Sequence, residues 1–100
     1  MNEVNYNLVP TKYFAKKFQK LIKNNQKILD KILNTYILLQ FNPFDSRLGT
    51  HKVDAKVSKD CYSTIVTGDL RIIWIFDEYE IKVIDLLNIG GHSGISSVYK

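Results

Sequence analysis

The stretch LRIIWIFDEYEIKVIDLLNI, residues 70–89, decides the fold class of this chain. It contains two apolar runs rich in isoleucine, and the polar residues 77–79 separate them. Isoleucine, valine and aromatic residues favour strands, and a short polar break between two such runs is typical of a turn. The run 70–76 is apolar almost throughout, which indicates a central strand that is covered in places on both faces.

Three further segments have strand patterns. Residues 51–57 alternate Val53, Ala55 and Val57 with polar residues, and the segment CYSTIVTGD, residues 61–69, follows and ends in a turn candidate. Near the N-terminus, residues 4–8 alternate apolar side chains with asparagine, and Pro10 ends this short pattern. These segments predict a sheet whose last strands, adjacent in sequence, run antiparallel.

Between the first strand and the others, the apolar period changes to that of helices. Thr11 occupies the position of an N-cap, and the first helix that it opens is amphipathic. The apolar face of this helix consists of Phe14, Phe18, Leu21 and Ile22, and its outward stripe of Lys12, Lys16, Lys20 and Lys23. A second helix begins near Asn25 and ends at Asn42 and Pro43. Its expected apolar face consists of Ile28, Leu29, Ile32, Leu33, Tyr36 and Ile37.

The sequence therefore predicts a single α+β domain over residues 1–100, because one hundred residues suffice for one modest core. The expected order is β-α-α-β-β-β, with a twisted, mainly antiparallel sheet and an N-terminal helical hairpin packed on one face. Cys61 is the only cysteine and lies inside a strand pattern, so we expect a buried apolar role for it. The sequence shows no secretory signal and no membrane span, and we expect a cytoplasmic protein.

The charge is unevenly distributed along the chain. Residues 1–59 contain eleven lysines and arginines against four acidic residues, whereas residues 60–100 contain three against six. One basic surface is therefore expected, together with a polyanionic or acidic partner. The lysine stripe of the first helix, with Lys27 and Lys31, could contact nucleic-acid phosphates or an acidic protein.

The residues that could carry chemistry lie near the expected strand ends. They are Arg47, His51, Lys52, Asp69, Arg71, His92 and Tyr99. Cleavage of RNA by its own 2′-hydroxyl requires a base, an acid and cations near the phosphate, and histidine, arginine and lysine supply these at neutral pH. This chemistry requires no metal, and two histidines alone do not make a zinc site, so we expect no metal and no cofactor.

Four features of the sequence resemble a known protein family. The element order, the loop LGTHKV, the strand TGDLRIIWIF and the ending IGGHSGISSVYK resemble the RelE/ParE superfamily of bacterial toxins, and within it the YafQ-like and RelE-type mRNA interferases. The resemblance spans essentially the whole chain. It implies a RelE-like fold, cleavage of mRNA, in many members at the ribosomal A site, and silencing by a cognate antitoxin.

The resemblance also implies which residues act. His51, Asp69 and His92 match catalytic positions of the family, and Tyr99 lies near the family's C-terminal aromatic residue. Where YafQ-like toxins have a further histidine on the third strand, this chain has Ile65.

The roles of these residues follow from the chemistry. We interpret His92 as general acid or base with His51 as its counterpart, Arg71 as a phosphate clamp, and Asp69 as orienting a histidine. The candidate substrate-binding cations are Arg47, Lys52 and Lys56.

Two other functions stay open on the same fold. The chain could be a non-catalytic inhibitor of DNA gyrase, as in the ParE branch, or a degenerate toxin that only binds its antitoxin. The histidine pair favours the nuclease.

The glycine-rich ending predicts a sharp exit from the last strand. Gly90, Gly91 and Gly94 surround His92 and give the backbone the freedom for such a turn, or for a loose chain end. Val98 and Tyr99 favour an ordered end, because they offer an apolar anchor.

Overall fold

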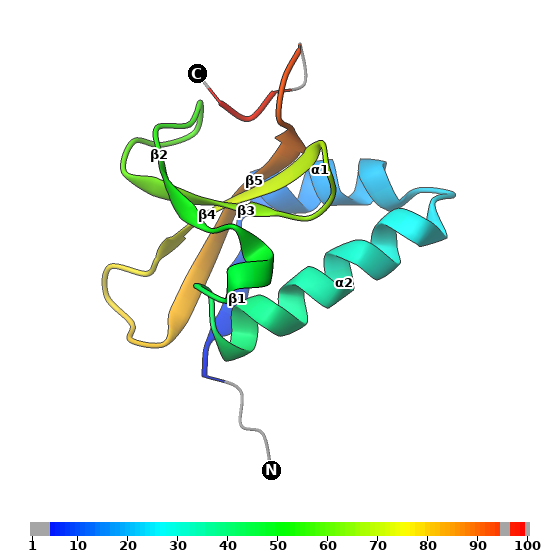
Figure 1. Cartoon of the computed structure of the whole chain (residues 1–100). Helices are drawn as coiled ribbons and strands as arrows, with labels where there is room; N and C mark the ends of the chain where they lie inside the picture. Colours follow the sequence, from blue (N-terminus) through cyan, green and yellow to red (C-terminus); the bar gives the residue numbers. More distant parts are fainter. Residues whose placement is uncertain (1–4, 95–96, 100) are drawn as a thin grey trace.

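The computed structural model describes residues 5–94 and 97–99, which form two helices and a five-stranded sheet (Figure 1). The expected first residue of the N-terminal strand, Val4, lies outside these ranges. The elements are β1 (Asn7–Pro10), α1 (Lys12–Ile22), α2 (Gln26–Phe41), a 3₁₀ turn η1 (Ser46–Leu48), β2 (His51–Val53), β3 (Cys61–Ile65), β4 (Leu70–Phe76) and β5 (Val83–Gly91).

The sheet has the strand order β1-β5-β4-β3-β2, in which β1 is parallel to β5 and the other neighbours are antiparallel. The α+β class, the mainly antiparallel sheet and the central position of β4 are confirmed. The expected order had one strand too few after the helices, since β2, β3, β4 and β5 are separate strands. The Asp77 carboxylate divides β4 from β5 by accepting hydrogen bonds from the backbone N–H groups of Tyr79 and Glu80.

The first helix begins as its sequence predicts. The Thr11 hydroxyl oxygen accepts a hydrogen bond from the backbone N–H of Phe14 at 3.2 Å, and the hydroxyl donates to the carbonyl oxygen of Leu86 at 2.9 Å. One side chain therefore caps α1 and ties the helix to β5. Phe14 is buried and Phe18 packs against the same core, while the lysine stripe is exposed, so the predicted faces of α1 are confirmed.

The predicted apolar face of the second helix is confirmed in part: Ile28, Ile32 and Tyr36 pack in or against the main core, but the helix is rotated away from the side of Leu33 and Ile37. Its buried residues are Ile32, Thr35 and Leu39, whereas Leu33 and Ile37 are 44% and 51% exposed. Thr35 tolerates burial because its hydroxyl donates to the carbonyl oxygen of Lys31. Apolar residues cover so wide an arc of α2 that periodicity alone could not decide which part of the arc meets the sheet.

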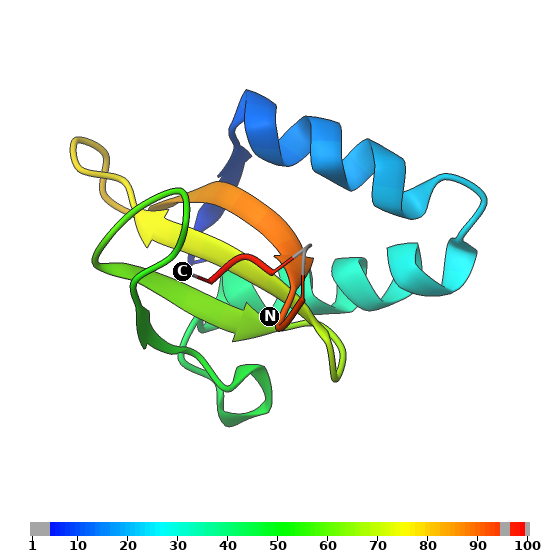
Figure 2. The ribbon, with the colours of Figure 1, turned by 90° about the horizontal axis from the view of Figure 1, so that it is seen from above.

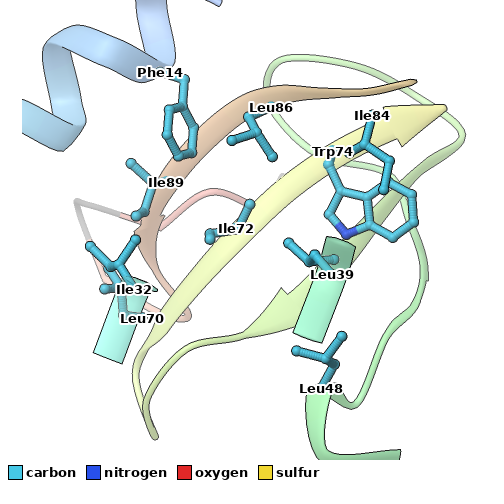
Figure 3. Close-up of a cluster of buried hydrophobic side chains, with 10 residues drawn as sticks. All are labelled: Phe14, Ile32, Leu39, Leu48, Leu70, Ile72, Trp74, Ile84, Leu86 and Ile89. Carbon is cyan, nitrogen blue, oxygen red and sulfur yellow. The ribbon is translucent and has the colours of Figure 1, made fainter. Parts of the chain in front are cut away.

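The main core lies between the helices and the sheet (Figure 3). Trp74 is fully buried there, and its indole N–H donates to the Thr64 hydroxyl at 2.8 Å, which satisfies the polar atom of the largest core side chain. A second, smaller core on the opposite face consists of Ala55, Cys61, Ile73 and Val98. Because Ile72 and Trp74 face one core and Ile73 faces the other, β4 is covered on both sides, as its composition predicts.

A β-bulge adjusts β5 to both cores. Ile73 pairs with Asn88 and Trp74 with Leu86, so Leu87 is an extra residue on β5. The bulge allows Leu86 and Ile89, three positions apart, to face the same main core. Neither α1 nor α2 has the length and apolar composition of a membrane-spanning helix.

The rotation of α2 can be tested with a matched pair of leucines. Leu39→Ala should lower the free energy of unfolding by about 2–5 kcal/mol, because it removes a fully buried side chain and leaves a cavity. Leu33→Ala should change it by about 0.5 kcal/mol or less, because Leu33 lies on the exposed side of the same helix. Urea unfolding of both variants measures the difference, and equal losses would contradict the observed orientation.

Candidate active site

The candidate site lies on the helix-free face of the sheet, which we define as the side opposite α1 and α2. Figure 2 shows residues 97–99 in red and the loop after β2 in green lying over the strands, with α2 behind them. Paired residues on neighbouring strands project to the same face, so His51, Ser63 and Ile73 form one row across it. Ile65 and Arg71 form the next row.

The C-terminal segment is held against this face. Val98 is fully buried in the second core, its backbone N–H donates to the carbonyl oxygen of Gly91, and its own carbonyl accepts from the N–H of Lys56. Tyr99 continues the contact by forming a β-bridge with Ala55. The predicted apolar anchor at Val98 is therefore confirmed, while residues 95, 96 and 100 of the expected ending lie outside the described ranges.

Tyr99 joins two parts of the site. Its hydroxyl is 2.5 Å from the hydroxyl oxygen of Ser63, which is completely buried on β3. The Tyr99 ring also meets the ring of His92 edge to face, with 5.4 Å between the centroids. Tyr99 thus packs against the sheet and supports His92 from one side.

Asp69 lies beside His92 because β4 and β5 are paired there, with Leu70 opposite Gly91. The carboxylate of Asp69 accepts a hydrogen bond from the backbone N–H of His92 at 3.2 Å. The prediction that Asp69 orients a histidine is therefore modified, since the observed bond fixes the backbone of His92 and does not reach its imidazole. The turn itself is held by the Thr67 hydroxyl, which accepts from the N–H groups of Asp69 and Leu70.

Arg71 is less available than the sequence suggests. Its side chain is buried, and Nη1 donates to the carbonyl oxygens of Thr67 at 2.7 Å and Leu70 at 3.2 Å. The guanidinium therefore stabilises the turn that carries Asp69. The observed contacts do not fit an exposed phosphate clamp.

His51 stands on the other side of the face, on the edge strand β2. Gly49 has a φ of 56°, a left-handed conformation suited to glycine, and directs its carbonyl oxygen to within 3.0 Å of His51 Nδ1. A carbonyl oxygen has no proton to donate and can only accept, so this contact favours the tautomer with a proton on Nδ1 and an acceptor at Nε2. Three strand spacings separate β2 from β5, about 14 Å in the hydrogen-bonding direction, so His51 and His92 flank the face without contact.

The three predicted substrate-binding cations are dispersed. Arg47 is exposed and makes a two-point contact with the Asp45 carboxylate, which lowers the pKa of Asp45 to about 2 through the hydrogen bonds from Arg47. Lys52 pairs with Tyr62, whose ring belongs to the main core, and so it projects away from His51. Lys56 is the member that lies on the helix-free face, beside Val98.

Ile65 is the last residue of β3, a strand that lies between β2 and β5 in the sheet. It is opposite Arg71 and is 37% exposed. It also lines a cavity of about 220 Å³ whose other walls come mainly from α2 and η1, among them Lys31 and Leu48, so this cavity adjoins α2. An apolar side chain therefore stands at the position where the resemblance implies a further histidine.

Sequence reasoning missed Ser63 and Lys17. No sequence pattern distinguishes Ser63 from the other serines, and its role is visible only in its contact with the Tyr99 hydroxyl. Lys17 fell between the outward stripe and the apolar face of α1, and its contact with Asn88 of β5 joins residues far apart in sequence. Within residues 5–94 and 97–99 no group of three histidine, cysteine or acidic residues is placed to hold a metal ion.

Comparisons with known proteins bear on this geometry. No protein-family model and no curated protein matches the sequence. Among solved structures, the chain is similar to the Escherichia coli DinJ–YafQ toxin–antitoxin complex, with 18% identity, a TM-score of 0.66, and coverage of 89% of this chain and 94% of that one. It has the RelE/ParE toxin fold.

Two further structures agree with this fold. The archaeal RelE–RelB complex from Pyrococcus horikoshii gives 23% identity and a TM-score of 0.64, with coverage of 85% and 92%. A YoeB/ParE toxin from Agrobacterium tumefaciens gives 12% identity and a TM-score of 0.70, with coverage of 87% and 99%. The RelE/ParE fold expected from the sequence is thus confirmed over most of the chain.

The contact between Tyr99 and Ser63 can be tested by removing one hydroxyl. Tyr99→Phe should lower the free energy of unfolding by about 1–3 kcal/mol, because the buried Ser63 hydroxyl loses its partner. In the Ser63→Ala background the same substitution should cost less, and a double-mutant cycle by urea unfolding measures the coupling. Additive losses would show that the two hydroxyls do not interact.

An acidic pair near the other end of β5 predicts a pH effect. Burial, followed by a hydrogen bond to Asp77, raises the pKa of Asp85 to about 6. An unfolded aspartate has a pKa of about 3.9, so between pH 4 and 6 the folded state binds the proton more tightly and stability falls as the pH rises. The lowered pKa of Asp77 acts only below that window. Asp85→Asn should remove the decline, as thermal unfolding at pH 4, 5, 6 and 7 can show.

Proposed function

We propose that this protein is the toxin of a toxin–antitoxin module and an endoribonuclease that cleaves mRNA, in association with the ribosome, to inhibit translation. The observation that carries the proposal is the placement of His51 and His92 on either side of one face, with Tyr99 between them. The similarity to toxins solved with their antitoxins supports the same class. The partner is then a cognate antitoxin that silences the enzyme.

In the proposed mechanism a ribose-phosphate unit lies between the two histidines over Ile65. His51 Nε2 accepts the proton of the 2′-hydroxyl, since its Nδ1 proton is directed to the Gly49 carbonyl. The 2′-oxygen attacks phosphorus, the bond to the 5′-oxygen breaks, and His92 donates a proton to that leaving oxygen. The products are a 2′,3′-cyclic phosphate and a 5′-hydroxyl.

The surrounding residues have supporting roles in this proposal. Asp69 fixes the backbone of His92, and Arg71 stabilises the turn that presents Asp69. Tyr99 holds the His92 ring and shields it from one side. A positioned acid or base contributes roughly 10²–10⁴ to a rate, which sets the expected cost of losing either histidine.

The proposal predicts that His92→Ala lowers the cleavage rate about 10²–10⁴-fold, because the acid for the leaving oxygen is lost. The measurement is single-turnover cleavage of a message on purified translating ribosomes, with the product ends identified as a cyclic phosphate and a 5′-hydroxyl. Tyr79→Ala is the control, since Tyr79 is 88% exposed in the β4–β5 connection, and it should cleave at the wild-type rate.

One observation favours a second function. Ile65 is an apolar, 37% exposed side chain where the resemblance implies a histidine, which suits an inhibitor that binds a protein surface without cleaving RNA. Intact messages in cells that express the wild-type protein, together with altered DNA supercoiling, would reject the nuclease and support inhibition of gyrase. A protein with neither effect that still binds its antitoxin would be a degenerate toxin.

A further inference from the structure

Lys17 has unusual surroundings for a lysine on a helix surface. Its ammonium donates to the Asn88 side-chain oxygen at 2.7 Å and lies 5.5 Å from the centre of the Tyr13 ring. Both neighbours are uncharged. In the part of the chain that the structure describes, the one ion pair joins Arg47 to Asp45, so no described carboxylate lies within 4.0 Å of Lys17.

A second lysine adds to this positive charge. Burial lowers the pKa of Lys17, and the charge of Lys56 lowers it further. Lys17 is half-buried and Lys56 is exposed. A partly buried charge is stabilised by a counter-ion, and no described acidic side chain provides one here. The two ammonium groups therefore lack a negative partner among the described residues.

Their position connects them to the candidate active site. The pairing of β1 with β5 ends at Pro10 and Leu86, and β5 is next bridged at Gly91, by Ser97. Asn88 lies in the gap between these two contacts among the described residues, and Lys17 reaches it from α1. Lys56 is attached to the same end of β5 through Val98, which bonds to Gly91, the residue before His92.

We propose that Lys17 and Lys56 form an anion-binding site that holds a backbone phosphate of the RNA next to the scissile one. The inference rests on the proposed function for the identity of the ligand, since Lys56 is joined through Val98 to Gly91, the residue before His92. The two lysines also add positive charge to that of Arg71, whose Nη1 is occupied by carbonyl oxygens. Asn88 and Tyr13 hold the Lys17 ammonium in place without neutralising it, so its charge stays available to a phosphate.

The test uses a single-stranded oligonucleotide with 2′-O-methyl riboses, which cannot be cleaved by 2′-hydroxyl attack. Its affinity for the full chain is measured by fluorescence anisotropy at salt concentrations from about 50 to about 300 mM, over which salt screens the attraction between lysine and phosphate to very different degrees. Lys17→Met should weaken binding several-fold at low salt and reduce the slope of log affinity against log salt by about 0.7, the value for one phosphate contact. Lys56→Met should do the same.

The matched control is Lys59→Met, which removes an equal charge from the same exposed loop as Lys56. It should leave the slope unchanged, and urea unfolding should confirm that all three variants are folded. Equal slopes for Lys17→Met and wild type would overturn the proposal, as would a wild-type protein that does not bind the oligonucleotide. Loss of antitoxin affinity in Lys17→Met with RNA affinity intact would also overturn it, by assigning the site to a protein carboxylate.

The failure of the nuclease proposal is distinguishable from the failure of this one. The wild-type protein could bind the methylated oligonucleotide with the predicted salt slope and yet leave natural messages intact. That result would reject the nuclease proposal and support the phosphate site. If wild type and Lys17→Met cleave messages at the same rate and bind the oligonucleotide with the same affinity, the nuclease proposal stands and the proposal of a phosphate site at Lys17 is rejected.

Discussion

The pairing of β4 with β5 is the constraint on which the rest of the structure depends. It runs from Leu70 opposite Gly91 to Phe76 opposite Ile84 and forms the middle of the sheet. Without this register the turn that carries Asp69 would not lie beside His92, because no local interaction joins residues so far apart in sequence. The same pairing sets the bulge at Leu87 that lets β5 serve both cores.

Residues 97–99 of the chain pack over the helix-free face of the sheet. Val98 fills the space above Ile73 and Cys61, and this apolar contact places Tyr99 over Ser63. Hydrophobic burial thus positions the aromatic ring that contacts His92. The geometry of the candidate site therefore depends on the packing of residues 97–99 against the sheet.

The RelE/ParE fold limits the function without determining it. Toxins on this scaffold share a sheet and two helices, whereas the chemistry depends on which side chains stand on the helix-free face. In this chain that face combines two separated histidines, an apolar Ile65 at the end of β3 and a buried arginine. This combination is the basis of the proposed nuclease, in which lysines on α1 and on the loop after β2 would contact the phosphates.

The amino-acid sequence by itself determined the local features. The cap at Thr11, the exposed stripe of α1, the doubly covered strand β4 and the anchor at Val98 all follow from patterns within a few residues, where side-chain period and capping act directly. Through the resemblance to a known family it also singled out Asp69 and His92, without indicating that the two lie side by side.

Only the tertiary structure decided the orientation of α2, the burial of Arg71 and the contacts of Ser63 and Lys17. The apolar arc of α2 allows several rotations of nearly equal local energy, so packing against the sheet selects one of them. The partners of Arg71 are backbone carbonyl oxygens, which every residue has, so the sequence cannot show that its guanidinium is engaged. Lys17 meets Asn88 only because α1 packs against β5, and contacts across such sequence distances arise from the assembled sheet and not from any segment alone.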